Sequence, residues 1–344
     1  MDDKIPELTG GNDPPNETHQ WEKSRQLVQA FGILPSPISG VIRLLTSEFS
    51  QAEFKSKLLT PIILVRLLHS DSFKAPYYYS IMLFKPDCFQ GLKRPFSTPN
   101  FLDAYSATEH AFLSGLIFTV KRARVTCDPN GFSQVVKRLQ LGVNLGWSIG
   151  SFLTPIGLLN GLLAGTYRWL GTLPFLHQDP EGFERYMKHI ERSQLALPDE
   201  EYERSEWGCT SAQNGILLLQ FSGFRSSTLT PLYEGTRPSI LVPRSNSLEF
   251  FFCATDIWLR YFLEETSSPR IALPGELYLD EKDRGWISTC VADTEPSKNA
   301  NWLLTGKDDI SVKQTPHLFL PDPNDHFADI PGYPEENGQL VVEA

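Results

Sequence analysis

The sequence predicts a mostly α-helical protein. From Trp21 onward, apolar residues recur at a spacing of about 3.6 residues, the period of a helix that is buried on one face. Helix-start signals precede several of these stretches, and strands do not alternate with helices as they do in α/β proteins. The chain has 344 residues, of which 41% are hydrophobic, so it is long enough to bury a large core. We therefore expect a helical bundle with a short irregular or β-containing C-terminal extension.

The domain organisation is inferred from changes in composition along the chain. Residues 1–20 are polar and rich in Asp, Pro, Gly and Asn, which predicts a disordered leader and not a secretory signal. The helical domain is expected over residues 21–269. The extension is expected over residues 270–315, and residues 316–344 predict a mobile, acidic and proline-rich tail.

Capping signals mark the expected helix starts. Ser50 with Glu53, and Ser106 with Glu109, have the spacing of a capping box. Asp179 precedes Pro180, which combines an N-cap residue with a proline in the first turn. Helices are expected over residues 61–68, 111–120, 180–192, 212–221 and 248–263.

Two regions are expected not to be helical. Residues 75–101 are aromatic, contain prolines and show little periodicity, which predicts a loop. In the extension, residues 277–279 and 286–288 predict short strands.

Charge and cysteine usage limit the classes of function. The formal net charge of -10 argues against broad binding to nucleic acids or anionic membranes. The five cysteines form no CxxC pair, which argues against a cysteine-based zinc site and fits a reducing compartment. We therefore expect a cytoplasmic protein without a cofactor.

A glycine-rich stretch, residues 139–167, contains no charged side chain. Thr154-Pro155 divides it, and the glycines on either side recur every fourth residue, which lets helices approach closely. These glycines are Gly142, Gly146 and Gly150, then Gly157, Gly161 and Gly165. We expect two buried helices that pack closely; a membrane-associated segment is the alternative, because the stretch is long enough to span a bilayer.

Short motifs occur in a fixed order along the helices. They are Leu34-Pro35, Asp71-Ser72-Phe73, Ala111 to Gly115, Gly161-Leu162-Leu163-Ala164-Gly165, Glu206 to Gly215, Gly235-Thr236-Arg237-Pro238 and Ala254-Thr255-Asp256. Taken together, residues 21–269 resemble the HD-related output domain (HDOD) family. The resemblance implies an HD-like helical bundle that is largely non-catalytic and acts in signalling or regulation through a protein partner.

The metal ligands of HD phosphohydrolases are replaced in this sequence. The family's Gly-Leu-Leu-His-Asp segment here ends in Ala164-Gly165, and later histidine positions hold Ser211, Gly235 and Thr236. Alanine and glycine offer no ligand atom, and hydroxyls are poor ligands beside imidazole or carboxylate. Of the ligand positions, only Asp256 is kept, so the resemblance implies no metal and no catalysis.

Basic residues give a prediction for the emptied pocket. The resemblance places Lys137, Arg138, Arg168 and Arg237 near it, where guanidinium groups could bind a nucleotide-like anion. We predict an anion-binding site at Arg138, Arg168 and Arg237. The alternative is that these are surface cations with buried aliphatic stems.

A serine hydrolase is the competing enzymatic hypothesis. Gly146-Trp147-Ser148-Ile149-Gly150 matches the G-x-S-x-G motif, in which the serine is the nucleophile on a strand-to-helix turn. Partners in the required order exist, namely Asp256 or Asp308 followed by His317 or His326. The glycine spacing instead favours a packing helix with a buried serine.

Overall fold

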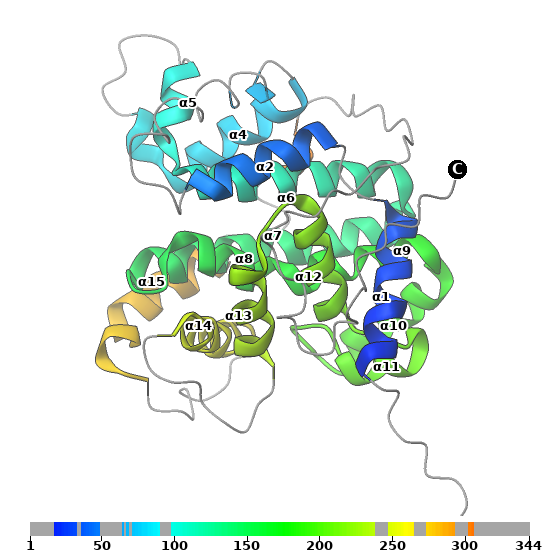
Figure 1. Cartoon of the computed structure of the whole chain (residues 1–344). Coiled ribbons are helices and arrows are strands. Elements are labelled where there is room, and N and C mark those ends of the chain that lie inside the picture. Colours follow the sequence, from blue (N-terminus) through cyan, green and yellow to red (C-terminus); the bar gives the residue numbers. More distant parts are fainter. Residues whose placement is uncertain are drawn as a thin grey trace, which may run out of the picture.

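A computed structural model of the chain is shown in Figure 1. The residues that it describes are 17–32, 36–48, 64, 67–68, 71–89, 98–237, 247–264, 273–292 and 302–305. Within these ranges every regular element is a helix, which confirms the mostly α-helical class. The expected capping box at Ser50, most of the helix expected over 61–68 and the tail over 316–344 lie outside the described residues.

The elements follow one another as short and medium-length helices. The first part of the chain contains α1 (Glu17–Phe31), α2 (Ser36–Glu48), α4 (Asp71–Phe84), η1 (Pro86–Phe89), α5 (Thr98–Ala104) and α6 (Ala107–Thr126). The middle contains α7 (Pro129–Phe152), α8 (Gly157–Gly171), α9 (Leu173–Gln178), α10 (Pro180–Arg192), α11 (Glu200–Trp207) and α12 (Ser211–Ser222). The last part contains α13 (Ser226–Thr236), α14 (Leu248–Leu263), η2 (Gly275–Leu277), α15 (Glu281–Ala292) and η3 (Trp302–Leu304).

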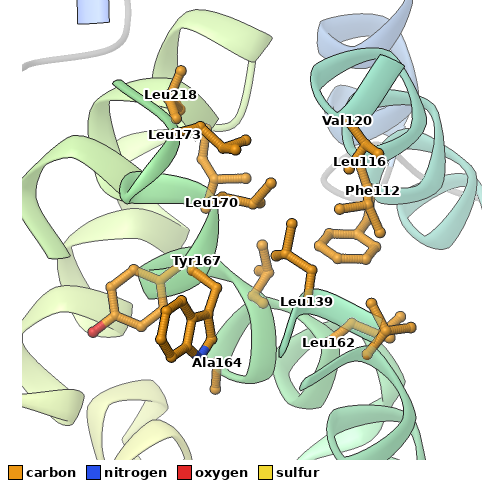
Figure 2. Close-up of a cluster of buried hydrophobic side chains, with 14 of the residues drawn as sticks. Phe112, Leu116, Val120, Leu139, Leu162, Ala164, Tyr167, Leu170, Leu173 and Leu218 are labelled. Carbon is orange, nitrogen blue, oxygen red and sulfur yellow. The ribbon is translucent and has the colours of Figure 1, made fainter. Parts of the chain in front are cut away.

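Helix α6 is the centre of the fold. Its residues from Thr108 to Ala123 are all buried, as expected of a helix that is covered on every side. Figure 1 shows α2, α4 and α5 on one side of it and α8 with α12 to α14 on the other. Figure 2 shows Phe112 and Leu116 of α6 facing Leu139 of α7 and Leu162 of α8, and all four side chains are buried. This core joins the two sides into one unit.

Helices α7 and α8 pack through their glycines, which confirms the expected pair of closely packed helices. Helix α7 ends at Phe152 and α8 begins at Gly157, so the helical run is interrupted around Thr154-Pro155. A Cβ atom placed on Gly146 would lie 2.2 Å from the carbonyl oxygen of Gly161, and one on Gly142 would lie 2.0 Å from that of Gly165. Backbone therefore contacts backbone, and no side chain fits between these positions. Searched over the described residues, no helix has the length and apolarity needed to cross a membrane.

Local capping signals were accurate where the structure describes them. Ser106 and Glu109 form a complete capping box at the start of α6. Asp179 caps α10, with Pro180 in its first turn. Ser247 caps α14. Helix α12 begins at the expected place, and Thr210 with Gln213 forms a further capping box there.

The expected loop over residues 75–101 is wrong. Helix α4 covers most of the first half of this range, and η1 and α5 follow it. Phe73, Tyr77 and Ile81 are buried four residues apart, so a helical period is present. The opposite face of α4 is also apolar and is exposed at Tyr79 and Met82, which hides that period in the sequence.

The strands expected in the extension are also wrong. Residues 277–279 lie at and after η2, and residues 286–288 lie inside α15. Asp280 accepts a hydrogen bond from the Asp283 amide at 2.7 Å, as an N-cap residue does, and its carboxylate favours a helix start here. At the other end of the chain, α1 begins at Glu17, within the range expected to be a leader.

Candidate functional site

Three helices, α8, α13 and α14, meet at a buried ion pair. The Arg168 guanidinium of α8 donates to the Asp256 carboxylate of α14 at 2.5 Å, and it also donates to the Thr236 carbonyl at the end of α13. Arg260 donates to the other oxygen of Asp256 at 2.8 Å. The HDOD resemblance implied that Arg168 and Asp256 lie near one pocket but did not predict that they bind each other.

Charge compensation keeps this pair ionised inside the protein. Burial alone would lower the pKa of Arg168, but the Asp256 carboxylate raises it above its ordinary value. Burial likewise works to raise the pKa of Asp256, and Arg168 and Arg260 together hold it below its ordinary value. A buried carboxylate with two guanidinium partners has no free charge with which to attract a metal cation.

A second contact ties α8 to α13. The hydroxyls of Tyr167 and Thr236 lie 2.5 Å apart, and the Thr236 hydroxyl also donates to the Leu232 carbonyl. Burial raises the pKa of Tyr167 to about 12, so the phenol stays neutral at physiological pH. The end of α13 is therefore fixed against α8 by Tyr167 and Arg168 together.

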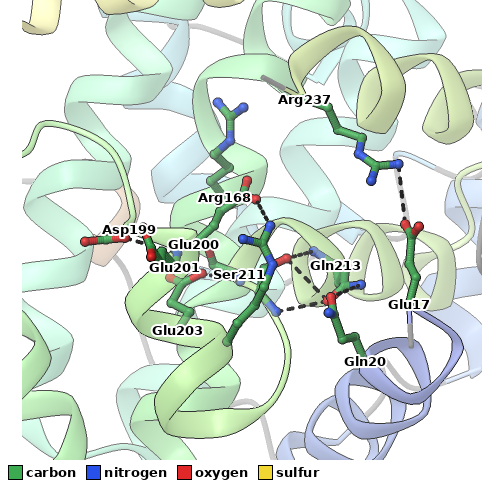
Figure 3. Close-up of polar contacts among 12 residues, drawn as sticks. Glu17, Gln20, Arg168, Asp199, Glu200, Glu201, Glu203, Ser211, Gln213 and Arg237 are labelled. Carbon is green, nitrogen blue, oxygen red and sulfur yellow. Dashed lines mark hydrogen bonds and ion pairs between the residues drawn. The ribbon is translucent and has the colours of Figure 1, made fainter. Parts of the chain in front are cut away.

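The three arginines expected to bind an anion do not share one set of contacts. Arg168 is engaged as described above. The Arg138 guanidinium lies 4.8 Å from the centre of the Trp169 ring and donates to the Leu195 carbonyl at 3.4 Å. Arg237 lies 3.4 Å from the carboxylates of Glu17 and Glu234. Figure 3 shows Arg237 beside Glu17, away from Arg168. Anion binding at these residues remains a prediction.

A buried carboxylate that the sequence did not single out lies close by, at the start of α12. Glu203 of α11 has no exposed surface. It accepts a hydrogen bond of 2.7 Å from the Tyr186 hydroxyl of α10. It accepts another of 2.7 Å from the backbone amide of Ser211, which lies beside it in Figure 3. The Tyr186 hydroxyl in turn accepts from the Asp199 amide at 3.0 Å, which connects α10, α11 and α12.

Burial raises the pKa of Glu203 to about 8, although the hydrogen bonds from Ser211 and Tyr186 work to lower it. The carboxyl group is therefore largely protonated at neutral pH. No sequence signal pointed to this group, because Glu203 stands eight positions before the start of α12, beyond the first turn in which the helix dipole acts. Its burial is set by the helices that pack around it.

Ser148 does not have the surroundings of a hydrolase nucleophile. It lies inside α7, and its hydroxyl donates to the Asn144 carbonyl one turn earlier at 2.9 Å. Only 4% of the surface of Ser148 is exposed. A nucleophile elbow needs a strand before the serine, whereas α7 is helical from Pro129 through Ser148 to Phe152. Asp256, one proposed triad acid, binds Arg168. The alternative acid Asp308, and His317 and His326, lie outside the described residues.

Within the part of the chain that the structure describes, no three His, Cys, Asp or Glu residues lie close enough together to hold a metal ion. Comparisons with protein-family models, with curated proteins and with solved structures found no match for this chain. The inferences below therefore rest on residues and geometry.

Proposed function

We propose that this chain is a non-catalytic signalling or regulatory protein, which acts in the cytoplasm through an HDOD-like protein-interaction domain. The motifs that carry the resemblance support this, because α8, α12, α13 and α14 pack against one another in the structure. Residues from α8, α13 and α14 converge at the Arg168–Asp256 pair.

The packing at Gly165 is the observation that carries the non-catalytic part of the proposal. Under the resemblance, position 165 is that of the aspartate in the family's metal-binding doublet. A Cβ atom there would lie 2.2 Å from the carbonyl oxygen of Gly142, so an aspartate cannot be accommodated with α7 and α8 this close. The neighbouring Ala164 is buried and has no ligand atom. Loss of the ligand is thus coupled to the way the helices pack.

The kept acidic residue points the same way. Asp256 is bound by Arg168 and Arg260, so its charge serves to join α8 to α14 and not to recruit a cation. Ser148 provides no competing nucleophile, because it is buried within a helix. A bundle with these features is suited to presenting its outer surface to a protein partner.

Phosphodiester hydrolysis tests the non-catalytic part of the proposal. The purified chain is incubated with bis(4-nitrophenyl) phosphate and Mn²⁺, Fe²⁺ or Zn²⁺, with Asp256→Asn as the matched control. We expect the rate of buffer alone from both proteins. Metal-dependent hydrolysis by the wild type that disappears in Asp256→Asn would overturn the proposal.

Crosslinking tests the interaction part. The tagged, intact chain is crosslinked in a lysate of its native source and recovered under denaturing conditions. We expect one discrete partner in near-stoichiometric amount. Recovery of the uncrosslinked chain alone, at physiological expression, contradicts an interaction module.

A further inference from the structure

Helix α11 is held in place by very few buried side chains. Of its eight residues, only Glu203 and Trp207 are buried. The Trp207 indole stacks on the Phe175 ring with centroids 4.3 Å apart, and it meets the Tyr186 ring edge-on at 5.4 Å. Glu203 is therefore one of two anchors that fix this helix to the rest of the protein, and it is the one that can ionise.

The surroundings of Glu203 supply hydrogen-bond donors but no ion pair. Its two oxygens accept from the Tyr186 hydroxyl and from the Ser211 amide, each at 2.7 Å. Among the described residues, no lysine, arginine or histidine binds its carboxyl group. Both of its partners are neutral, so neither compensates a full negative charge.

Comparison with Asp256 shows what this lack of a cation implies. Asp256 is buried as a carboxylate because the guanidinium groups of Arg168 and Arg260 bind it. Taking a carboxylate out of water without such a partner costs so much free energy that the group takes up a proton instead. The position of Glu203 therefore favours its protonated form, which agrees with the pKa of about 8 to which burial raises it.

Further acidic groups lie around Glu203. The Glu200 carboxylate also raises the pKa of Glu203, and Figure 3 shows Asp199, Glu200 and Glu201 grouped beside it. Helix α12 has no charged side chain. The other titratable or charged groups on the elements that pack here are Tyr186, His189 and Arg185 of α10, Arg204 and Glu206 of α11, Cys209, Asp179, Lys23 of α1, Arg138 of α7, Arg168 of α8 and His177 of α9.

We propose that α11 is a pH-sensitive latch, which is closed while Glu203 carries a proton and opens locally when that proton is released, uncovering the aromatic surface beneath Trp207. A group whose pKa is raised in the closed state stabilises that state at low pH, and this stabilisation is lost as the pH rises through the raised pKa. The latch is therefore closed at pH 6 and opens more often towards pH 8. In the open state Glu203 reaches water, and Phe175 and Tyr186 lose the cover of the indole. This inference uses the contacts of α11 alone, so it does not depend on the resemblance to the HDOD family.

Hydrogen exchange of the intact chain, followed by mass spectrometry, tests this proposal. Peptides that cover residues 199–210 are compared with peptides of the buried helix α6 from pH 6 to pH 9, after correction for the intrinsic pH dependence of exchange. With a pKa of 4.5 for Glu203 in the open state and about 8 in the closed state, the opening equilibrium constant of α11 rises about 50-fold between pH 6 and pH 8. Peptides of α6 are expected to exchange far more slowly at every pH, because the opening is local.

Two variants separate Glu203 from the other acidic groups. Glu203→Gln keeps the size of the side chain but cannot ionise, so the corrected exchange of its α11 peptides should no longer depend on pH. Glu201→Gln is the matched control, because it removes an exposed carboxylate from the same helix, and it should keep the 50-fold rise.

Three results would overturn the proposal. The first is α11 protection in the wild type that stays constant between pH 6 and pH 8, a measurement that needs no variant to fold. The second is α6 peptides that exchange as fast as those of α11, which would show that the opening is global. The third is a pH-dependent rise that persists in Glu203→Gln, which would assign the titration to another group.

Discussion

Replacing Gly146 by alanine tests the closest contact between α7 and α8. The added Cβ would lie 2.2 Å from the Gly161 carbonyl oxygen and 2.8 Å from its carbon, whereas ordinary contact begins at 3.4 Å. Both atoms belong to backbone, so no flexible side chain can move aside. The two helices must separate by about 1 Å, which also loosens the neighbouring glycine contacts.

The free-energy change can be worked from two opposing effects. Overpacking of a core costs about 1–3 kcal/mol, and backbone contact this short places Gly146→Ala at the upper end. Alanine inside a helix regains about 1 kcal/mol relative to glycine. We therefore expect a net loss of about 2 kcal/mol, and a melting temperature lower by about 3 °C. Gly146→Leu and Gly161→Leu are expected to lower it further or to prevent soluble expression.

Gly285→Ala is the matched control. Gly285 lies within α15, and a Cβ atom there would have nothing within 4 Å. This variant should gain about 0.5–1 kcal/mol, because only helix propensity and unfolded-state entropy change. Both variants are compared with the wild type by urea denaturation and thermal melting. If Gly146→Ala is stabilised as much as Gly285→Ala, the close packing of α7 against α8 is refuted.

Three further predictions concern buried polar groups. Because burial raises the pKa of Glu203 to about 8, the stability that its protonated carboxyl contributes is present below the pKa of the unfolded state and is lost as the pH rises towards 8. Glu203→Gln should therefore gain stability relative to the wild type as the pH rises towards 8. Urea-unfolding midpoints of the two proteins that change in parallel with pH would contradict this. Arg168→Met should lose roughly 3–5 kcal/mol in urea unfolding, because Asp256 stays buried with one partner fewer, and an unchanged midpoint would count against the pair. Ser148 should not react with a fluorophosphonate probe, since its hydroxyl is buried and bound to Asn144; stoichiometric labelling that Ser148→Ala abolishes would restore the hydrolase hypothesis.

Local signals in the sequence were sufficient to predict those features, such as helix starts, that depend on residues close together in the chain. The capping boxes and the N-cap at Asp179 involve residues three positions apart, so their pattern is visible without a fold. The glycine spacing of 139–167 predicted close packing, because a bare helix face is costly unless another helix covers it. Helix α4 was missed because its exposed face is apolar as well as its buried one.

The polar contacts could not be predicted, because they join distant parts of the chain. Arg168 and Asp256 are separated by 88 positions, and Lys121 reaches Thr305 across 184. Sequence patterns place such residues on a helix face but do not specify the partner. Burial, which decides the pKa of Glu203, is likewise set by the packing of α10 and α12 around it and not by its neighbours in the sequence.

Packing alone accounts for several of the residues on which the expected resemblance to the HDOD family rests. Gly161 and Gly165 are required by the contact with α7, and Gly215 is required because its Cβ would lie 2.1 Å from the Tyr167 carbonyl oxygen. Close helix packing would demand these glycines in a bundle of any ancestry. Asp256 is different, because a buried carboxylate costs free energy and no packing contact demands one. A well-packed apolar pair could join α8 to α14 at lower cost, so Asp256 and the arginine that neutralises it are the residues at this contact that packing alone does not explain.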